Sequence, residues 1–313
     1  MLSRVGERVY WMARYLERVE NTARLINVHT ALLMDLPKQK EINWFTLIKI
    51  FHCEKAYHEQ HLRIDEKHIM HFLVAEMDNP SSLAQALFNA RENVRTSLDV
   101  LPEEIWEQIN ELHLMVKASL SAIGNRRRRQ NMLLNIMERC QCISGIIDNH
   151  MSRNHAYDFI QIGKHIERAD MTSRILEMTS LLVTESPSES ARKHRGILWA
   201  NLLKAISAQQ MFLHEKRTSI EPDKVLDFLI TDRALPRSLS FSLASIGSYL
   251  KLLPNPEDTI ATQQQILENL SDYRSSTIPP DQAHFRMDSL QMRLIELHKK
   301  ISARWFHPDF EII

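Results

Sequence analysis

Glycine is scarce in this chain. It supplies only 6 of the 313 residues, where average usage of about 7% would supply about 22. Tight turns between neighbouring strands depend on glycine, because glycine adopts positive φ at little steric cost. Apolar residues instead recur three or four positions apart, which is the spacing of one helical face. We therefore predict an all-α fold of roughly eight to twelve helices.

The charge balance excludes some classes of partner. Lysine and arginine together number 39, and aspartate and glutamate also number 39, so no overall field draws the chain to nucleic acid or to a membrane. Its charged opening segment predicts neither a signal peptide nor a membrane span. The odd number of cysteines, 3, predicts no disulfide framework. We expect a cytoplasmic protein without a cofactor.

An internal repeat organises the sequence. The segment RYLERVENTARLI at 14–26 aligns with KHIERADMTSRIL at 164–176, so that Glu17 pairs with Glu167 at an offset of 150 residues. Two more pairs of segments follow in the same order at offsets of 155 and 156, namely 44–51 with 199–206 and 72–87 with 228–243. This order predicts a single helical domain over 1–313. We expect an internal duplication of 1–150 and 151–313, built as a helical bundle related by a pseudo-two-fold.

The repeated segment carries a charged helical face. In the first copy, residues at helical spacing form a polar band opposite an apolar one: Tyr10, Arg14, Glu17, Glu20, Asn21 and Arg24. The band favours either of two structures. It is a solvated face with weak ion pairs, or the two copies meet in a partly buried cleft and present arginines to a carboxylate or phosphate.

A second group of arginines lies outside the repeat's first helix. Arg91 and Arg95 share one predicted helical face, and Arg237 follows a proline in the matching segment of the second half. Arginine near a helix start is typical of anion sites, because free N–H groups also point there. The competing interpretation is an exposed surface arginine.

Metal and nucleic-acid sites are not predicted. Histidines crowd one stretch, at His52, His58, His61, His68 and His71, but their spacing matches no metal motif,. That stretch instead favours an exposed, histidine-rich helix. The run Arg126–Arg129 follows Gly124-Asn125 and lacks interleaved aromatic residues, so it is typical of a basic helix start in solvent.

The opening MLSRVGERVYWMARYLERVENTARL resembles the start of the bacterial alpha-E domain family, as do the segments at 79–95, 103–110, 167–174 and 235–243. The resemblance covers most of the chain and implies a helical fold. It also implies a partner, because members are usually encoded beside or fused to an ATP-grasp protein that resembles peptide-bond-forming amidoligases. The family pattern implies tryptophan at Tyr157 and arginine at Lys164, so we expect weaker binding by the second face.

We therefore hypothesise a non-catalytic helical partner of an ATP-grasp amidoligase-like protein, in the synthesis or handling of a small peptide or amide. The residues expected to bind the ligase, or an anionic peptide or carboxylate ligand, are Arg14, Glu17, Glu20, Arg24, Arg91, Arg95, Glu167, Arg168, Asp170, Arg174 and Arg237. One alternative is an enzyme that uses a buried glutamate as general acid or base on a peptide-like substrate. Another is a metal site built from the repeated carboxylates, although these lack the histidine that such sites place at i+3.

Overall fold

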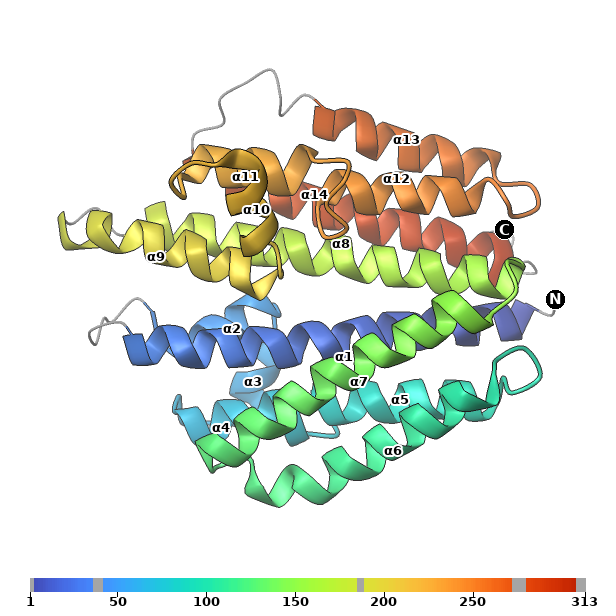
Figure 1. Ribbon diagram of the computed structural model, residues 1–313, viewed down its shortest axis with the longest axis horizontal. Coiled ribbons are helices and arrows are strands. Elements are labelled where there is room, and N and C mark those ends of the chain that lie inside the picture. The colour runs from blue at the N-terminus through green and yellow to red at the C-terminus, as the bar shows by residue number, and fades with distance from the viewer. Residues whose placement is uncertain (1–2, 36–41, 185–188, 272–279, 308–313) are drawn as a thin grey trace. The chain divides into compact units, whose positions relative to one another are not determined.

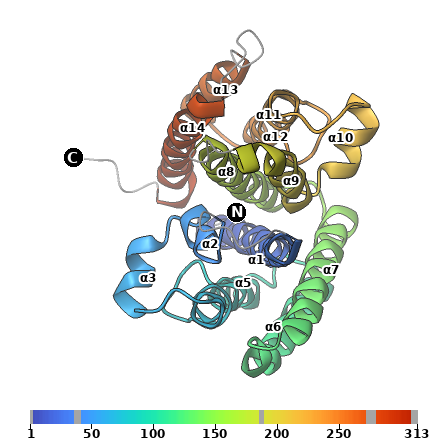
Figure 2. The same cartoon turned by 90° about the vertical axis from the view of Figure 1, so that its left-hand side faces the viewer.

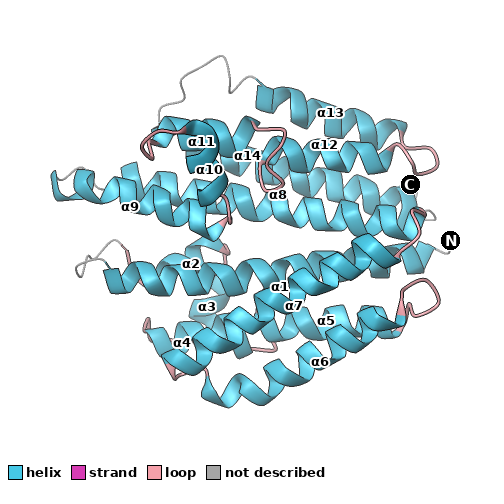
Figure 3. Ribbon diagram, viewed as in Figure 1, coloured by secondary structure: helices cyan, strands magenta, loops and turns pink. Residues whose placement is uncertain are grey.

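The computed structural model describes residues 3–35, 42–184, 189–271 and 280–307. Every regular element within these ranges is a helix (Figure 3). The all-α prediction is therefore confirmed. The number of helices was underestimated, because the described residues contain fourteen α-helices, α1 to α14. Several of the additional ones are short and lie between residues 45 and 70, where the apolar pattern is broken by polar residues.

The chain divides into two compact units, and each is described by itself. The first unit contains α1 and the segment from Asn43 to Lys164, and the second contains Ile42 and the segment from His165, inside α8, onward. Figure 1 gives the order of the helices by colour. The helices of the first unit are α1 (Ser3–Asp35), α2 (Phe45–Ile50), α3 (Glu54–Gln60), α4 (Glu66–Met70), α5 (Leu83–Arg95), α6 (Glu103–Ser119), α7 (Arg126–His150) and the start of α8 (His155–Thr184).

Helix α1 is the centre of the first unit. It packs along α5 and along α7, while α6 packs against both of these, and Figure 2 views α1 nearly end-on, with α5 below it and α7 to its right. Its apolar band is buried, as expected for Met12 and Val19. Most of its polar band is buried too: Tyr10 has no exposed surface, and Arg14 is half-buried. Helix α1 is therefore a core helix and not an amphipathic surface helix.

The second unit is built from the rest of α8 and six further helices. These are α9 (Glu189–Ala205), α10 (Gln209–Lys216), α11 (Pro222–Thr231), α12 (Leu239–Leu250), α13 (Glu257–Ser271) and α14 (Pro280–Ile301). Helix α12 packs against α11 and α13, and α13 packs against α14. Gly247 permits a close approach here, because a Cβ would lie 2.6 Å from the side-chain oxygen of Gln263. The amide of Gln263 in turn donates to the carbonyl oxygen of Leu243 at 2.7 Å.

Serine residues cap the start of a helix in each unit. The hydroxyl of Ser82 accepts a hydrogen bond from the backbone N–H of Gln85 at 3.2 Å and caps α5. In the second unit, the hydroxyl of Ser238 accepts one from the N–H of Phe241 at 3.0 Å and caps α12. Ser82 and Ser238 occupy aligned positions of the predicted repeat. Such caps contribute about 1 kcal/mol each to helix stability.

Gly163 lets α1 and the start of α8 approach closely in the first unit. A Cβ at residue 163 would lie 2.4 Å from the backbone carbonyl oxygen of Tyr10. The Gly163→Ala variant should therefore lose about 1–3 kcal/mol of unfolding free energy, because backbone must shift to make room. Gly145→Ala in α7 is the matched control. No atom lies within 4 Å of its added Cβ, so it should gain up to about 1 kcal/mol from helix propensity. Urea denaturation measures both, and equal effects would contradict the close approach.

Candidate functional site

The charged band of α1 is buried. Glu17, Glu20 and Arg24 are only 4%, 6% and 6% exposed, so the solvated-face interpretation is wrong for this copy. Arg24 and Glu20 form a close ion pair one turn apart. The side-chain amide of Asn21 donates to a carboxylate oxygen of Glu17 at 3.3 Å. One guanidinium nitrogen of Arg24, Nη1, is buried without a hydrogen-bond partner among the described residues.

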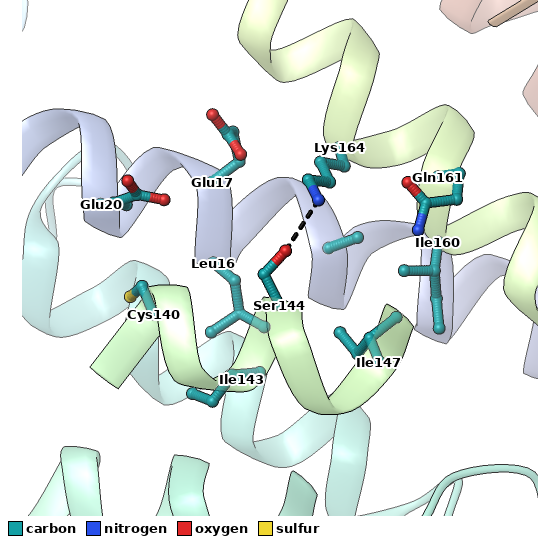
Figure 4. A pocket seen from close by; sticks show the side chains of 11 residues that line it. Leu16, Glu17, Glu20, Cys140, Ile143, Ser144, Ile147, Ile160, Gln161 and Lys164 are labelled. Carbon is teal, nitrogen blue, oxygen red and sulfur yellow. Dashed lines mark hydrogen bonds between the residues drawn. The ribbon is translucent and has the colours of Figure 1, made fainter. Parts of the chain in front are cut away.

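A small cavity of about 30 Å³ lies beside these carboxylates, within the first unit. Its walls come from α1, α7 and the start of α8 (Figure 4), and its lining residues are Ala13, Leu16, Glu17, Glu20, Cys140, Ile143, Ser144, Ile147, Ile160, Gln161 and Lys164. A water molecule needs about 10–15 Å³ of such space. The cavity therefore has room for one or two waters but not for a peptide.

Lys164 closes one side of the cavity. Its ammonium group donates to the hydroxyl of Ser144 at 2.7 Å (Figure 4) and lies 3.9 Å from a carboxylate oxygen of Asp148. Asp148 also accepts hydrogen bonds from Gln161 and Tyr157, both at 3.0 Å. Tyr157 and Lys164, where the resemblance implies tryptophan and arginine, thus both take part in one polar network around Asp148.

Cys140 lies on the cavity wall next to the glutamates. Burial raises the pKa of its thiol well above the usual value, and the negative charges of Glu20 and Glu17 act in the same direction. The thiol is therefore protonated at neutral pH, whereas nucleophilic cysteines need the thiolate. The structure gives Cys140 a packing role and no reactive one.

The second charged segment lies on α8 in the second unit. Glu167 and Arg168 are buried. The carboxylate of Asp170 accepts a hydrogen bond from Nε of Arg174 at 2.8 Å, in a pair that keeps about a sixth of each side chain exposed. Arg168 donates to the carbonyl oxygen of Pro236 at 3.4 Å. The half-buried Arg237 offers its own carbonyl oxygen to Thr172 at 3.2 Å. This face is also largely buried and internally paired.

The arginines of α5 are paired with an acid between them. Arg91 and Arg95 both donate to the carboxylate of Glu92, at 2.7 and 2.8 Å. Arg91 also donates to Asn110 at 2.8 Å and lies over the ring of Trp106. Arg95 is exposed, whereas the other predicted site residues are buried or half-buried. Two positive charges therefore share one negative charge on this surface, which leaves an excess of positive charge.

Arg14 stacks on its neighbour instead of lining the cavity. Its guanidinium lies 4.7 Å from the ring centroid of Trp11 and 5.9 Å from that of Tyr10. Cation–π contacts of this kind contribute about 0.5–1 kcal/mol when partly exposed. The structure thus brings Glu17, Glu20 and Arg24 together, while Arg14 and the arginines of α5 lie elsewhere in the first unit.

A sequence model for a family described as a predicted alpha-helical domain with a conserved ER motif matches residues 1–306. The chain belongs to the Alpha-E family. This confirms the resemblance seen in the opening segment. Glu-Arg pairs occur in both repeated segments of this Alpha-E chain, at 17–18 and 167–168.

Relatives of this Alpha-E chain are found in mycobacteria. Uncharacterised proteins of Mycobacterium bovis and of two strains of Mycobacterium tuberculosis are 22% identical to it over 320 residues. The match covers 96% of this chain but only 35% of each relative, so the chain spans about a third of their length. No solved structure matches the chain. Among the described residues of this Alpha-E domain, no helix is long and apolar enough to cross a membrane.

The histidine-rich stretch does not form one exposed helix, so that prediction is wrong. Helix α3 ends before His61, which is its C-terminal cap. His68 lies in α4, and His71 begins a π-helix over His71–Ala75. Residues 61–65 are not helical, and the ligand atoms of His61, His71 and Glu76 come together. Sequence spacing could not reveal this group, because its geometry depends on where the short helices end.

The arginine run at the start of α7 holds a carboxylate from α4. Arg126 donates to Glu66 at 2.9 Å, and Arg129 donates to the same carboxylate at 2.6 Å. Burial alone would raise the pKa of Glu66, but hydrogen bonds and charge from the two arginines outweigh it and lower the pKa. Arg126 is 56% exposed and Arg129 only 2%. The expectation of a solvated run is thus wrong for Arg129.

Proposed function

We propose that this Alpha-E chain is a non-catalytic helical partner of an ATP-grasp amidoligase-like protein, acting in the cytoplasm on the synthesis or handling of a small peptide or amide. The observation that carries the proposal is that acids in both repeated segments already form ion pairs within the chain. Glu20 and Asp170 each pair with the arginine one turn later, at Arg24 and Arg174. Groups committed to each other form a rigid frame and are poorly placed to act on a substrate.

The dimensions of the cavity support the same conclusion. A volume of about 30 Å³ beside Glu17 and Glu20 leaves no room for a peptide-like substrate. Recognition of a peptide would therefore take place outside this cavity. The length of the relatives also fits a partner role, since a domain that spans 35% of a longer protein works next to other parts of that protein.

An internal duplication is part of this proposal. Two kinds of local structure support it, each within its own unit. Ser82 and Ser238 cap α5 and α12 in the same way, and both repeated segments place an acid and an arginine at i and i+4. A duplicated frame would give a partner two similar surfaces to bind.

The surface that fits the partner best is the end of α5. Arg91, Glu92 and Arg95 carry excess positive charge there, and Arg95 is exposed. Exposed charges of this kind mainly steer association and set specificity. An acidic patch on the ligase, or the carboxylate of an anionic peptide that it carries, has the complementary charge.

Isothermal titration calorimetry of the purified chain with the ATP-grasp protein from the same organism, with and without ATP, tests the proposal. We expect saturable binding that Arg95→Glu weakens by about tenfold, which corresponds to about 1.4 kcal/mol. Arg127→Glu is the matched control, because Arg127 is also an exposed arginine but lies at the start of α7. No binding, or equal weakening by both variants, would contradict the proposed surface.

A second candidate is an enzyme that uses Glu17 or Glu20. Its support is that both buried carboxylates and Lys164 line the same cavity. Turnover of an amide by the isolated chain, lost on Glu17→Gln with folding intact, would favour this candidate over the partner role.

A further inference from the structure

Three potential ligand atoms converge between α3 and α5, away from the cavity. Oε2 of Glu76 lies 3.3 Å from Nδ1 of His71 and 3.8 Å from Nε2 of His61. All three groups offer ligand atoms within 4.8 Å of one another. Among the described residues, no other three histidine, cysteine or carboxylate side chains bring their ligand atoms this close together.

The spacing of these atoms suits a metal ion better than direct pairing. The distance of 3.8 Å from His61 to Glu76 is too long for a hydrogen bond,. Two ligand atoms at about 2.1 Å from a tetrahedral zinc ion lie about 3.4 Å from each other. The observed 3.3 and 3.8 Å lie close to that value. A small contraction around an ion would complete the geometry.

The unsatisfied nitrogen of His61 independently points to a ligand. Nε2 of His61 is buried and has no hydrogen-bond partner in the part of the chain that the structure describes, whereas most buried polar atoms have one. Nε2 lies 3.8 Å from Oε2 of Glu76, so an ion between these two atoms would supply the partner that this nitrogen lacks.

The backbone explains how His71 and Glu76 come to share one side. The N–H of Glu76 donates to the carbonyl oxygen of His71 at 3.0 Å, which is the i to i+5 bond of a π-helix. In an α-helix, residues five apart point about 140° away from each other. The wider turn brings them together. Such π-turns occur frequently at functional sites.

Neighbouring contacts hold the three residues in place without using their ligand atoms. The ring of Tyr57 stacks on that of His61 with 5.1 Å between centroids, and its hydroxyl donates to the carbonyl oxygen of Arg63 at 2.6 Å. Asn79 donates to the carbonyl oxygen of Phe72 at 2.9 Å, which fixes the far end of the segment. The site is therefore built before any ion arrives.

We propose that His61, His71 and Glu76 bind a divalent transition-metal ion, with zinc the best match to two imidazoles and one carboxylate. Three protein ligands leave a fourth position open to water. His68 lies beside the trio, with its ring 5.9 Å from that of His61, but Asp65 holds its Nδ1 at 2.7 Å. The site is independent of the proposed ligase partnership, because it uses none of the residues of that surface.

Zinc titration of the untagged, chelator-treated full-length protein tests the site, followed by elemental analysis and by the absorption spectrum of the cobalt-substituted protein. We expect one ion per chain and a tetrahedral cobalt spectrum. His71→Ala should weaken zinc binding by more than the roughly 10–100-fold that follows loss of an outer-shell partner. The His71 side chain is 53% exposed, so this variant should remain folded.

His58→Ala is the matched control, because His58 is an exposed histidine of the same stretch that lies outside the trio. It should leave zinc affinity unchanged, while Glu76→Gln should weaken it as His71→Ala does. Absence of zinc binding by the unmodified chain would overturn the proposal. So would equal affinity of the His71→Ala and His58→Ala variants, since surface histidines would then account for the binding.

Discussion

Replacing Arg129 with alanine should lower the unfolding free energy by about 3–5 kcal/mol, which is typical of breaking a buried ion pair. Arg129 is almost fully buried and donates both to Glu66 and to the carbonyl oxygen of Ile123, the latter at 2.7 Å. Its guanidinium also lies 6.0 Å from the ring centroid of Trp44. The variant loses all of these contacts, and the partly buried carboxylate of Glu66 keeps, among the described residues, only Arg126 as a positively charged partner. Chemical denaturation followed by circular dichroism measures the change.

Arg126→Ala is the control for this prediction, because Arg126 binds the same carboxylate from solvent. Surface ion pairs contribute about 0–1 kcal/mol, so its effect should be at most about 1 kcal/mol. Similar losses in the two variants would show that burial of Arg129 does not set the strength of the pair.

Acidification should destabilise the protein through His29. The residue is buried, and burial lowers its pKa from 6.5 to about 4, although a hydrogen bond to the carbonyl oxygen of Asn43 acts in the opposite direction. Between these two values, the unfolded chain binds a proton that the folded chain does not. The stability that neutral His29 contributes to the folded protein is therefore full above pH 6.5 and declines as the pH falls. By pH 4 the loss should reach roughly 3 kcal/mol, at 1.36 kcal/mol per pKa unit.

The His29→Gln variant isolates this effect, because glutamine does not titrate and its amide can still donate to Asn43. Unfolding free energies from urea denaturation at pH 7, 6, 5 and 4 should fall more steeply for the unmodified chain than for the variant. Parallel pH profiles would mean that His29 is protonated in the folded protein as readily as in the unfolded one. Carboxylates such as Glu66, whose pKa is lowered, contribute to both profiles equally.

Local signals predicted the secondary structure well because they depend on neighbouring residues. The scarcity of glycine and the helical spacing of apolar residues predicted the fold class, and Ser82 and Asn125 cap helices as such residues commonly do,. The number of helices was less accurate. Between residues 45 and 75, short helices are stabilised by packing of side chains such as Tyr57 and Phe72 more than by propensity,.

Burial of the charged band could not be derived from its pattern. Charges at i and i+4, such as Glu20 and Arg24, occur on solvated helices and in cores alike, and only the packing of α5 and α7 on α1 distinguishes the two cases. The cavity, the pairing of Glu66 with Arg129 and the meeting of His61 with Glu76 share this origin. Each joins residues through tertiary contacts or helix ends that carry no periodic signal.

The sequence by itself determined the helical class, the Alpha-E family and the register of the repeated Glu and Arg residues, because these depend on composition and on order along the chain. The tertiary structure alone decided which charges are buried, which arginine remains exposed and which histidines share a ligand position. The physical reason is that solvation and ligand geometry depend on distances across the fold. Such distances arise from packing between helices that are far apart in the sequence.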